Sequence, residues 1–169
     1  MARTRLGESL KGNAMGSKLS PRMTEDEVWA FVRDAHTGIF TTLRRDGMPI
    51  AMPMWFVCVG RDVYMQTRGK KLQRIENDPR SSFLVETGDR WGELVAVHLT
   101  GSSEHIEPDA ELLQSFADEM DRKYRAFRGD STEMPKETAE YYARQMRGLV
   151  RFVADERTLN WDNSKMNSN

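Results

Sequence analysis

The chain has 169 residues, which is enough for one domain with a sizeable buried core. Its 25 Lys and Arg residues against 26 Asp and Glu residues give a formal net charge of -1, so no overall electric field selects nucleic acid or an anionic membrane. Hydrophobic residues make up 38% of the chain, an ordinary globular composition, and no apolar run reaches transmembrane length or resembles a signal peptide. We therefore expect a cytoplasmic protein that binds neither nucleic acid nor a membrane.

Residues that form disulfides or bind metals are few. Cys58 is the only cysteine, which excludes an intramolecular disulfide and is compatible with a reducing compartment. His36, His98 and His105 show none of the spacings of metal-binding motifs, so no protein-bound metal is expected. No pair of side chains stands out as an acid–base dyad, and the catalytic residues therefore stay unassigned.

Composition divides the chain into one domain and two tails. Residues 1–22 are rich in Gly, Ser, Lys and Arg and show no apolar period, which predicts a disordered tail. A single domain is expected at 23–165, followed by a frayed tail at 166–169. The domain begins with a capping box, in which Thr24 is followed three residues later by Glu27.

Alternating and helical spacings of apolar residues predict the elements of this domain. The first is a helix that ends near Gly38. The others, in chain order, are strands 39–44, 50–59 and 63–67, a helix at 70–77, strands 82–86 and 94–106, helices at 108–127 and 135–147, and a strand at 149–159.

Turn residues and prolines indicate how the strands are joined. Asp46-Gly47 is typical of a hairpin turn. Pro49 and Pro53 cannot donate to a strand ladder, so the second strand is expected to start at a sheet edge or a bulge, and Gly101 predicts a bulge in the long strand. About six strands joined mainly by hairpins, with helices between them, predict an α+β fold: a six-stranded antiparallel barrel with peripheral helices.

One stretch combines the groups that an anionic ligand needs. Thr67-Arg68-Gly69-Lys70-Lys71 opens a helix directly after a strand, where backbone N–H groups, a hydroxyl and cations converge. Upstream, Met52-Pro53-Met54-Trp55 supplies a flat apolar surface suited to a conjugated ring. We therefore expect a ring cofactor with a phosphate tail. The alternatives are solvated lysines and ordinary core methionines, while Arg80 either contacts the cofactor or fixes its turn by a salt bridge.

The order of several short motifs resembles a known superfamily. The motifs are Thr37-Gly38, Asp46-Gly47-Met48-Pro49, Met54-Trp55-Phe56, Tyr64, Thr67, Lys71, Ile75, Asp78-Pro79-Arg80, Gly101 and Asn160-Trp161-Asp162. From roughly Met23 to Lys165, the chain resembles the pyridoxamine 5'-phosphate oxidase-like, FMN-binding split β-barrels. It is most similar to their flavin/deazaflavin oxidoreductase branch, although the connection after Thr67 is shorter and Arg74 stands where Asn is common.

This resemblance implies a homodimer with its two cofactor sites between the subunits, and a cofactor that is coenzyme F-420 (a deazaflavin) or FMN. The ring would lie along the apolar strand and the phosphate would meet the cations at the helix start. Trp161, which follows the last expected strand, would approach from the partner subunit. The cofactor-binding residues implied in this way are Met52, Pro53, Met54, Trp55, Gln66, Thr67, Arg68, Lys70, Lys71, Arg80 and Trp161.

Three classes of function follow from these features. The first is an oxidoreductase that uses F-420 for hydride transfer to a small, flat, electron-accepting substrate. The second is an FMN-dependent oxidase or reductase of the pyridoxamine-phosphate-oxidase-like type. The third is a dimer that binds a flavin or haem without catalysis. The sequence does not indicate which small, flat molecule is the substrate.

Overall fold

The computed structural model describes residues 20–127, 137, 140–141 and 147–166. Most of the expected helix at 135–147 and most of both expected tails lie outside the described residues. The elements are α1 (Glu25–Asp34), β1 (Gly38–Leu43), β2 (Pro49–Met54), β3 (Val57–Val59), β4 (Asp62–Arg68), α2 (Lys70–Asn77), β5 (Arg80–Thr87), η1 (Trp91–Glu93), β6 (Val95–Ile106), α3 (Ala110–Tyr124), η2 (Arg125–Phe127), β7 (Arg147–Asp162) and η3 (Asn163–Met166).

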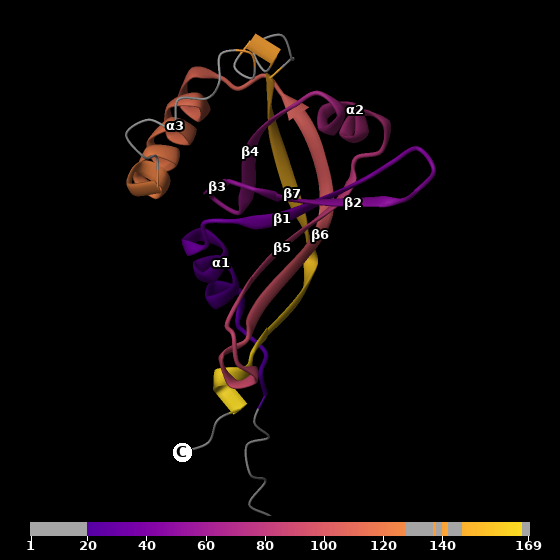
Figure 1. The fold of residues 1–169 in the computed structure, drawn as a ribbon. Coiled ribbons are helices and arrows are strands. Elements are labelled where there is room, and N and C mark those ends of the chain that lie inside the picture. The colour runs from indigo at the N-terminus through magenta and orange to yellow at the C-terminus, as the bar shows by residue number, and fades with distance from the viewer. Residues whose placement is uncertain (1–19, 128–136, 138–139, 142–146, 167–169) are drawn as a thin grey trace, which may run out of the picture.

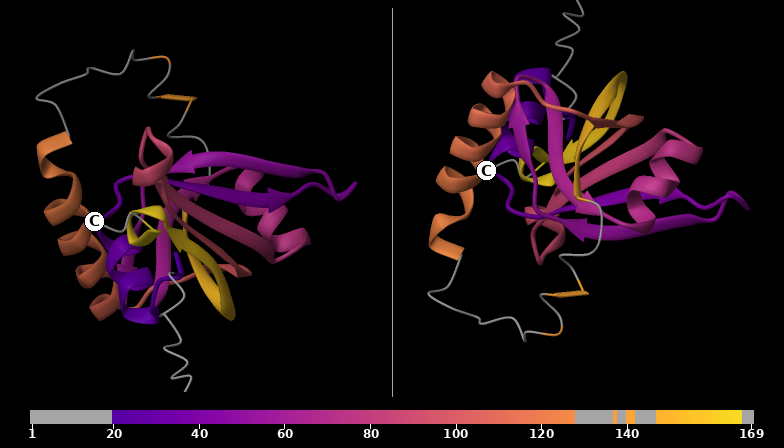
Figure 2. Two further views of the ribbon diagram at one scale, coloured as in Figure 1. Left: turned by 90° about the horizontal axis from the view of Figure 1, so that it is seen from below. Right: turned by 90° about the horizontal axis from the view of Figure 1, so that it is seen from above.

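Within this described part, seven strands form one curled antiparallel sheet in the order β2-β1-β5-β6-β7-β4-β3 (Figure 1). The predicted α+β split-barrel class is confirmed. The proline-containing strand β2 lies at one edge of the sheet, as the lack of proline N–H donors predicts. Both views of Figure 2 show α3 on one side of the molecule and α2 on the other.

The sheet has seven strands rather than the expected six because the strand predicted at 50–59 is two strands. Its first half, β2, pairs with β1, and its second half, β3, pairs with β4 at the opposite edge of the sheet. Trp55 and Phe56 connect the two. The backbone N–H and carbonyl of Phe56 bond to the Tyr124 hydroxyl instead of a neighbouring strand, so the ladder is interrupted there.

The main core lies on the inner face of the curled sheet and is covered by two helices. α1 contributes Val28, Trp29 and Val32, and α2 contributes Leu72 and Ile75, each at helical spacing. The capping box predicted at the start of α1 is present. A second, smaller cluster lies between α3 and strands β3, β4 and β7. No helix of the described residues is long and apolar enough to cross a membrane.

The long strands β6 and β7 pair along most of their length, and the predicted bulge is confirmed. Their register shifts between Leu99 and Gly101. A Cβ atom at Gly101 would lie 2.0 Å from the backbone oxygen of Val153, so this close approach requires glycine. β7 also continues to Asp162, and Trp161 therefore lies within the last strand rather than beyond it.

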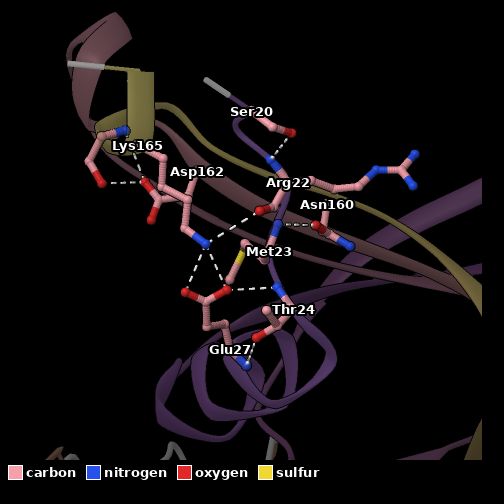
Figure 3. A network of polar contacts seen from close by, with 9 residues as sticks. Ser20, Arg22, Met23, Thr24, Glu27, Asn160, Asp162 and Lys165 are labelled. Carbon is pink, nitrogen blue, oxygen red and sulfur yellow. Dashed lines mark hydrogen bonds and ion pairs between the residues drawn. The ribbon is translucent and has the colours of Figure 1, made fainter. Parts of the chain in front are cut away.

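The two ends of the described chain are held together by polar contacts (Figure 3). The backbone N–H of Asp162 donates to the carbonyl of Pro21 over 2.7 Å. The Lys165 ammonium donates to both carboxylate oxygens of Glu27, which lies in the first turn of α1. This hydrogen bond, together with bonds from Thr24, lowers the pKa of Glu27 to about 2. The contacts tie the start of α1 to the end of β7.

Candidate functional site

Strand β2 presents a row of apolar side chains at the open edge of the sheet. Directly paired residues of antiparallel strands share a face, and Met52 pairs with Phe40, a core residue of β1. Ile50 and Met54 share this inner face by alternation. Because no strand of the described residues pairs with the other side of β2, Met52 stays 42% exposed, whereas Met54 is buried. The row forms an apolar ledge beside the core.

The start of α2 lies next to this ledge. Its N-cap is Gly69, with φ of 61°, and no side chain caps the helix. The first turn holds no acidic residue but two lysines, Lys70 and Lys71, an arrangement that the helix dipole disfavours unless an anion is bound. The Lys71 ammonium donates to the sulfur of Met54 over 3.3 Å, and this contact joins the helix start to the ledge.

Several cations lie close together around Lys71. Burial, followed by the charges of Arg74 and Arg68, lowers the pKa of Lys71. The Nε atom of Arg74 donates to the buried Oγ1 atom of Thr42 over 2.9 Å, which places this guanidinium against β1. Thr67, at the end of β4, is also buried. A phosphate bound here would relieve the repulsion among these cations.

Other sequence-predicted residues lie apart from this group. The Trp55 ring stacks on Tyr124 of α3, with centroids 4.4 Å apart and an angle of 10° between the ring planes. Gln66 is exposed, between buried Met65 and Thr67. Pro53 pairs with Ile39 and therefore lies on the outer face of the sheet, opposite to Met52 and Met54.

Of the two roles that the sequence left open for Arg80, the structure shows the salt bridge within its turn. Its guanidinium donates to both carboxylate oxygens of Asp78, over 3.0 Å and 2.6 Å. This hydrogen bond raises the pKa of Arg80 and lowers that of Asp78. The arginine is exposed, and the contact fixes the turn before β5.

Trp161 lies on the outer face of the sheet. It pairs with Ala96 of β6, in a row that alternates with the core residues Val97 and Leu99, and it is partly exposed. Within one subunit it is therefore on the opposite face from Met54 and Lys71. Single-chain geometry does not bring these sequence-predicted residues together.

A stripe of three apolar side chains and one histidine, here called the apolar stripe, crosses this outer face. Alternation along the paired strands places Ile39 of β1, Leu84 of β5, His98 of β6 and Leu159 of β7 side by side, since Ile39 pairs with Leu84, Leu84 with His98, and His98 with Leu159. None of the four belongs to either core cluster of the described residues. Leu159 is 53% exposed.

Sequence reasoning missed the side chains that close the corner between β2 and β3. The Tyr124 hydroxyl lies 2.8 Å from the N–H and 2.7 Å from the carbonyl oxygen of Phe56, and 2.8 Å from the carbonyl oxygen of His36. The Lys123 ammonium also donates to the Phe56 carbonyl, over 3.2 Å. The helical period of α3 placed Tyr124 on its inner side, but no local pattern indicated a buried lysine.

An open-edged, curled antiparallel sheet with a helix inserted after its fourth strand defines a split β-barrel protein. A family model described as pyridoxamine 5'-phosphate oxidase matches residues 24–159, and the chain belongs to this family. Among curated proteins, no significant match is found.

Solved structures share this fold. A conserved hypothetical protein from Mycobacterium tuberculosis, Rv2991, is 30% identical, with 88% of this chain and 91% of that chain covered and a TM-score of 0.70. An FAD-binding protein from Mesorhizobium loti is 17% identical, with 82% and 94% covered and a TM-score of 0.60. An F420 reductase is 22% identical, with 77% and 94% covered and a TM-score of 0.52.

Proposed function

We propose that the chain binds a flavin or deazaflavin phosphate and acts as an oxidoreductase. The observation that carries this proposal is the cluster of cations at the uncapped start of α2, joined to the apolar ledge by the contact between Lys71 and Met54. The two surfaces suit two parts of one ligand. The cations suit a phosphate, and the ledge suits the face of a conjugated ring.

The residues present fit such a group. Thr67, Lys70 and Lys71 would hold the phosphate, together with the free N–H groups of the first turn of α2. Met52 and Met54 would support one face of the ring, where their sulfur atoms make favourable contacts with aromatic systems. When bound, a flavin or deazaflavin supplies hydride transfer, and the protein contributes binding, orientation and exclusion of water.

We favour coenzyme F-420, the deazaflavin with an acidic tail, over FMN. Arg74 adds a cation beside Lys71, and a ligand with more negative charge than one phosphate would use it. The neighbouring fold of an F420 reductase is consistent with this choice, and that of an FAD-binding protein keeps a flavin as the second candidate. The acceptor substrate would be a small, flat molecule that reaches the exposed side of the ring.

We also propose that the protein is a homodimer; that its cofactor sites lie between the subunits is what the family resemblance implies. The apolar stripe on the outer face of the sheet supports this proposal, because such a stripe on a soluble protein marks an interaction surface. Trp161 lies on the same face as Leu159, two residues away along β7. Pairing of two outer faces would bring the aromatic ring of one subunit to the other subunit.

A paired fluorescence titration of the dialysed protein with F-420 and with FMN tests the proposed function. We expect tighter binding of F-420 and a loss of affinity of about tenfold or more for both ligands in Lys71→Ala, because a charge-assisted phosphate contact is removed. Arg122→Ala is a suitable control, since Arg122 lies on α3 and pairs with Glu119 at the surface.

Other outcomes of this titration would change the proposal. Preferential FMN binding would favour an FMN-dependent oxidase or reductase. A tight complex whose redox state no candidate acceptor perturbs would favour a binding protein without turnover. Binding of neither ligand would reject the oxidoreductase, and a Soret band on titration with haem would then support a haem-binding dimer.

A further inference from the structure

A groove of about 710 Å³ lies between α2 and the β1–β2 hairpin. Its lining contains four cations, Arg44, Arg45, Lys70 and Arg74, against a single carboxylate, Glu76. The groove is therefore strongly positive although the whole chain is almost neutral. This local excess of one charge indicates an anionic occupant.

The cations come from two separate elements that face each other. On α2, the groove is lined by residues at helical spacing, with Lys70 and Arg74 four positions apart on one face. On the other side, Arg44 and Arg45 stand directly after β1, where the hairpin turns. A ligand in the groove would meet positive charge from both walls.

Contacts within the protein leave most of this charge available. Arg44 pairs with Asp46, a carboxylate of the hairpin turn, and both side chains are more than half exposed. Arg45 donates to a neutral amide, the Asn77 oxygen, over 3.5 Å. Arg74 uses its Nε atom for Thr42, which leaves the other guanidinium nitrogens for a ligand. Exposed ion pairs of this kind are weak and easily exchanged.

The groove adjoins the phosphate position of the proposed function. Lys70 lines the groove, and its neighbour Lys71 contacts Met54 of the ledge. Arg74 also lines the groove while it lowers the pKa of Lys71 by charge repulsion. The cations therefore form a continuous path from the ledge, past the start of α2, to the hairpin.

We propose that this groove binds a second anionic group of the ligand, separated from its ring-proximal phosphate. This role of the groove rests on the proposed function. The shared chemistry is a flexible chain that carries a further phosphate or carboxylate. FMN has one terminal phosphate and would leave the groove unused. The diphosphate of FAD and the acidic tail of F-420 both supply the additional negative charge.

Fluorescence titrations with FMN, FAD and F-420 test this groove in the variant Arg44→Gln/Arg45→Gln. We expect the affinity for the ligand that uses the groove to fall about tenfold, because two ion pairs are lost, and the affinity for FMN to stay within about twofold. The affinity difference between wild type and variant should shrink at high salt. The matched control is Arg122→Gln/Arg125→Gln, which removes the same charge from the last turn of α3 and the residue that follows it, on the other side of the molecule (Figure 2).

The outcomes separate the two proposals. A selective loss for F-420 identifies a carboxylate chain as the occupant, and a selective loss for FAD identifies a diphosphate. If FMN and the longer ligands bind the wild type and are affected equally by the variant, or not at all, the groove proposal is rejected while the proposed function stands. If none of the three ligands binds the wild type, both proposals are rejected.

Discussion

Lys123 is a cationic residue inside the protein, with 7% of its surface exposed. Its ammonium lies 3.7 Å from the centre of the Phe56 ring and donates to the Phe56 carbonyl. The ion pairs found among the described residues do not include it. Burial therefore lowers the pKa of Lys123 from 10.5 to about 8, and the charged form destabilises the fold.

This shift predicts that the protein becomes more stable as the pH rises from 8 to 10.5. Between these values the unfolded chain binds more protons at Lys123 than the folded chain, so the free energy of unfolding increases with pH. The increase should reach about 3 to 4 kcal/mol at most, since each pKa unit corresponds to about 1.4 kcal/mol. Urea unfolding across this pH range measures it.

Lys123→Met is the control for this prediction, because other buried groups titrate with the opposite sign. Burial raises the pKa of Cys58 to about 11 and that of Tyr124 to about 12, so each stabilises the fold less as the pH rises through its titration range. The difference between wild type and variant isolates the lysine. An equally steep rise in Lys123→Met would contradict the assignment.

At the scale of elements, α3 closes the corner between the two edges of the sheet. β2 and β3 are consecutive in the chain, yet they lie at opposite edges, and the Phe56 backbone between them bonds to Tyr124. The same corner follows Met54, the end of the apolar ledge. α3 thus holds the chain just after the ledge in place, although none of the ledge residues lies on this helix.

Removal of the Tyr124 hydroxyl tests this role of α3. In Tyr124→Phe the buried N–H of Phe56 loses its partner, which should lower the free energy of unfolding by about 2 kcal/mol. Urea unfolding measures the loss. Tyr64→Phe is the matched control with an expected cost below about 1 kcal/mol, because its partner Asp62 keeps two hydrogen-bonding contacts from Arg151. Equal losses of unfolding free energy in both variants would show that the Tyr124 hydroxyl contributes no more to stability than the Tyr64 hydroxyl.

The same corner marks the limit of what the sequence predicts. Local signals placed α1, α2, most strand positions and the bulge at Gly101 correctly, because capping boxes, alternation and turns act between near neighbours. The break in the strand at 50–59 depends on Tyr124, 68 residues from Phe56, which no local pattern encodes. The same limit applies to the groove, whose walls belong to two separate elements.

For the candidate site, the sequence predicts the helix start but not the orientation of its neighbours. The segment Thr67 to Lys71 carries its own signal, since lysines in an uncapped first turn are unusual. By contrast, Trp55 follows the ledge in sequence but stacks on α3, and strand pairing turns Pro53 to the outer face. Which face a side chain occupies depends on register, and register depends on long-range pairing.

On the scale of the whole molecule, the sheet has one face packed on the core and one that carries the apolar stripe of Ile39, Leu84, His98 and Leu159. The helices α1 and α2 both pack on the core side. Exposure of Leu159 and Trp161 on the other face is unfavourable for an isolated subunit. In the proposed homodimer, a second copy of the chain would cover both residues.

A charge in this stripe is expected to separate the proposed homodimer. In Leu159→Asp, association would bury a carboxylate in an apolar interface, a cost of several kcal/mol that should turn a dimer into monomers. Light scattering coupled to size-exclusion chromatography measures the mass. The control is Leu113→Asp on α3, because Leu113 is 54% exposed against 53% for Leu159. A wild-type monomer, or a Leu159→Asp dimer as tight as the control, would contradict dimerisation through this face.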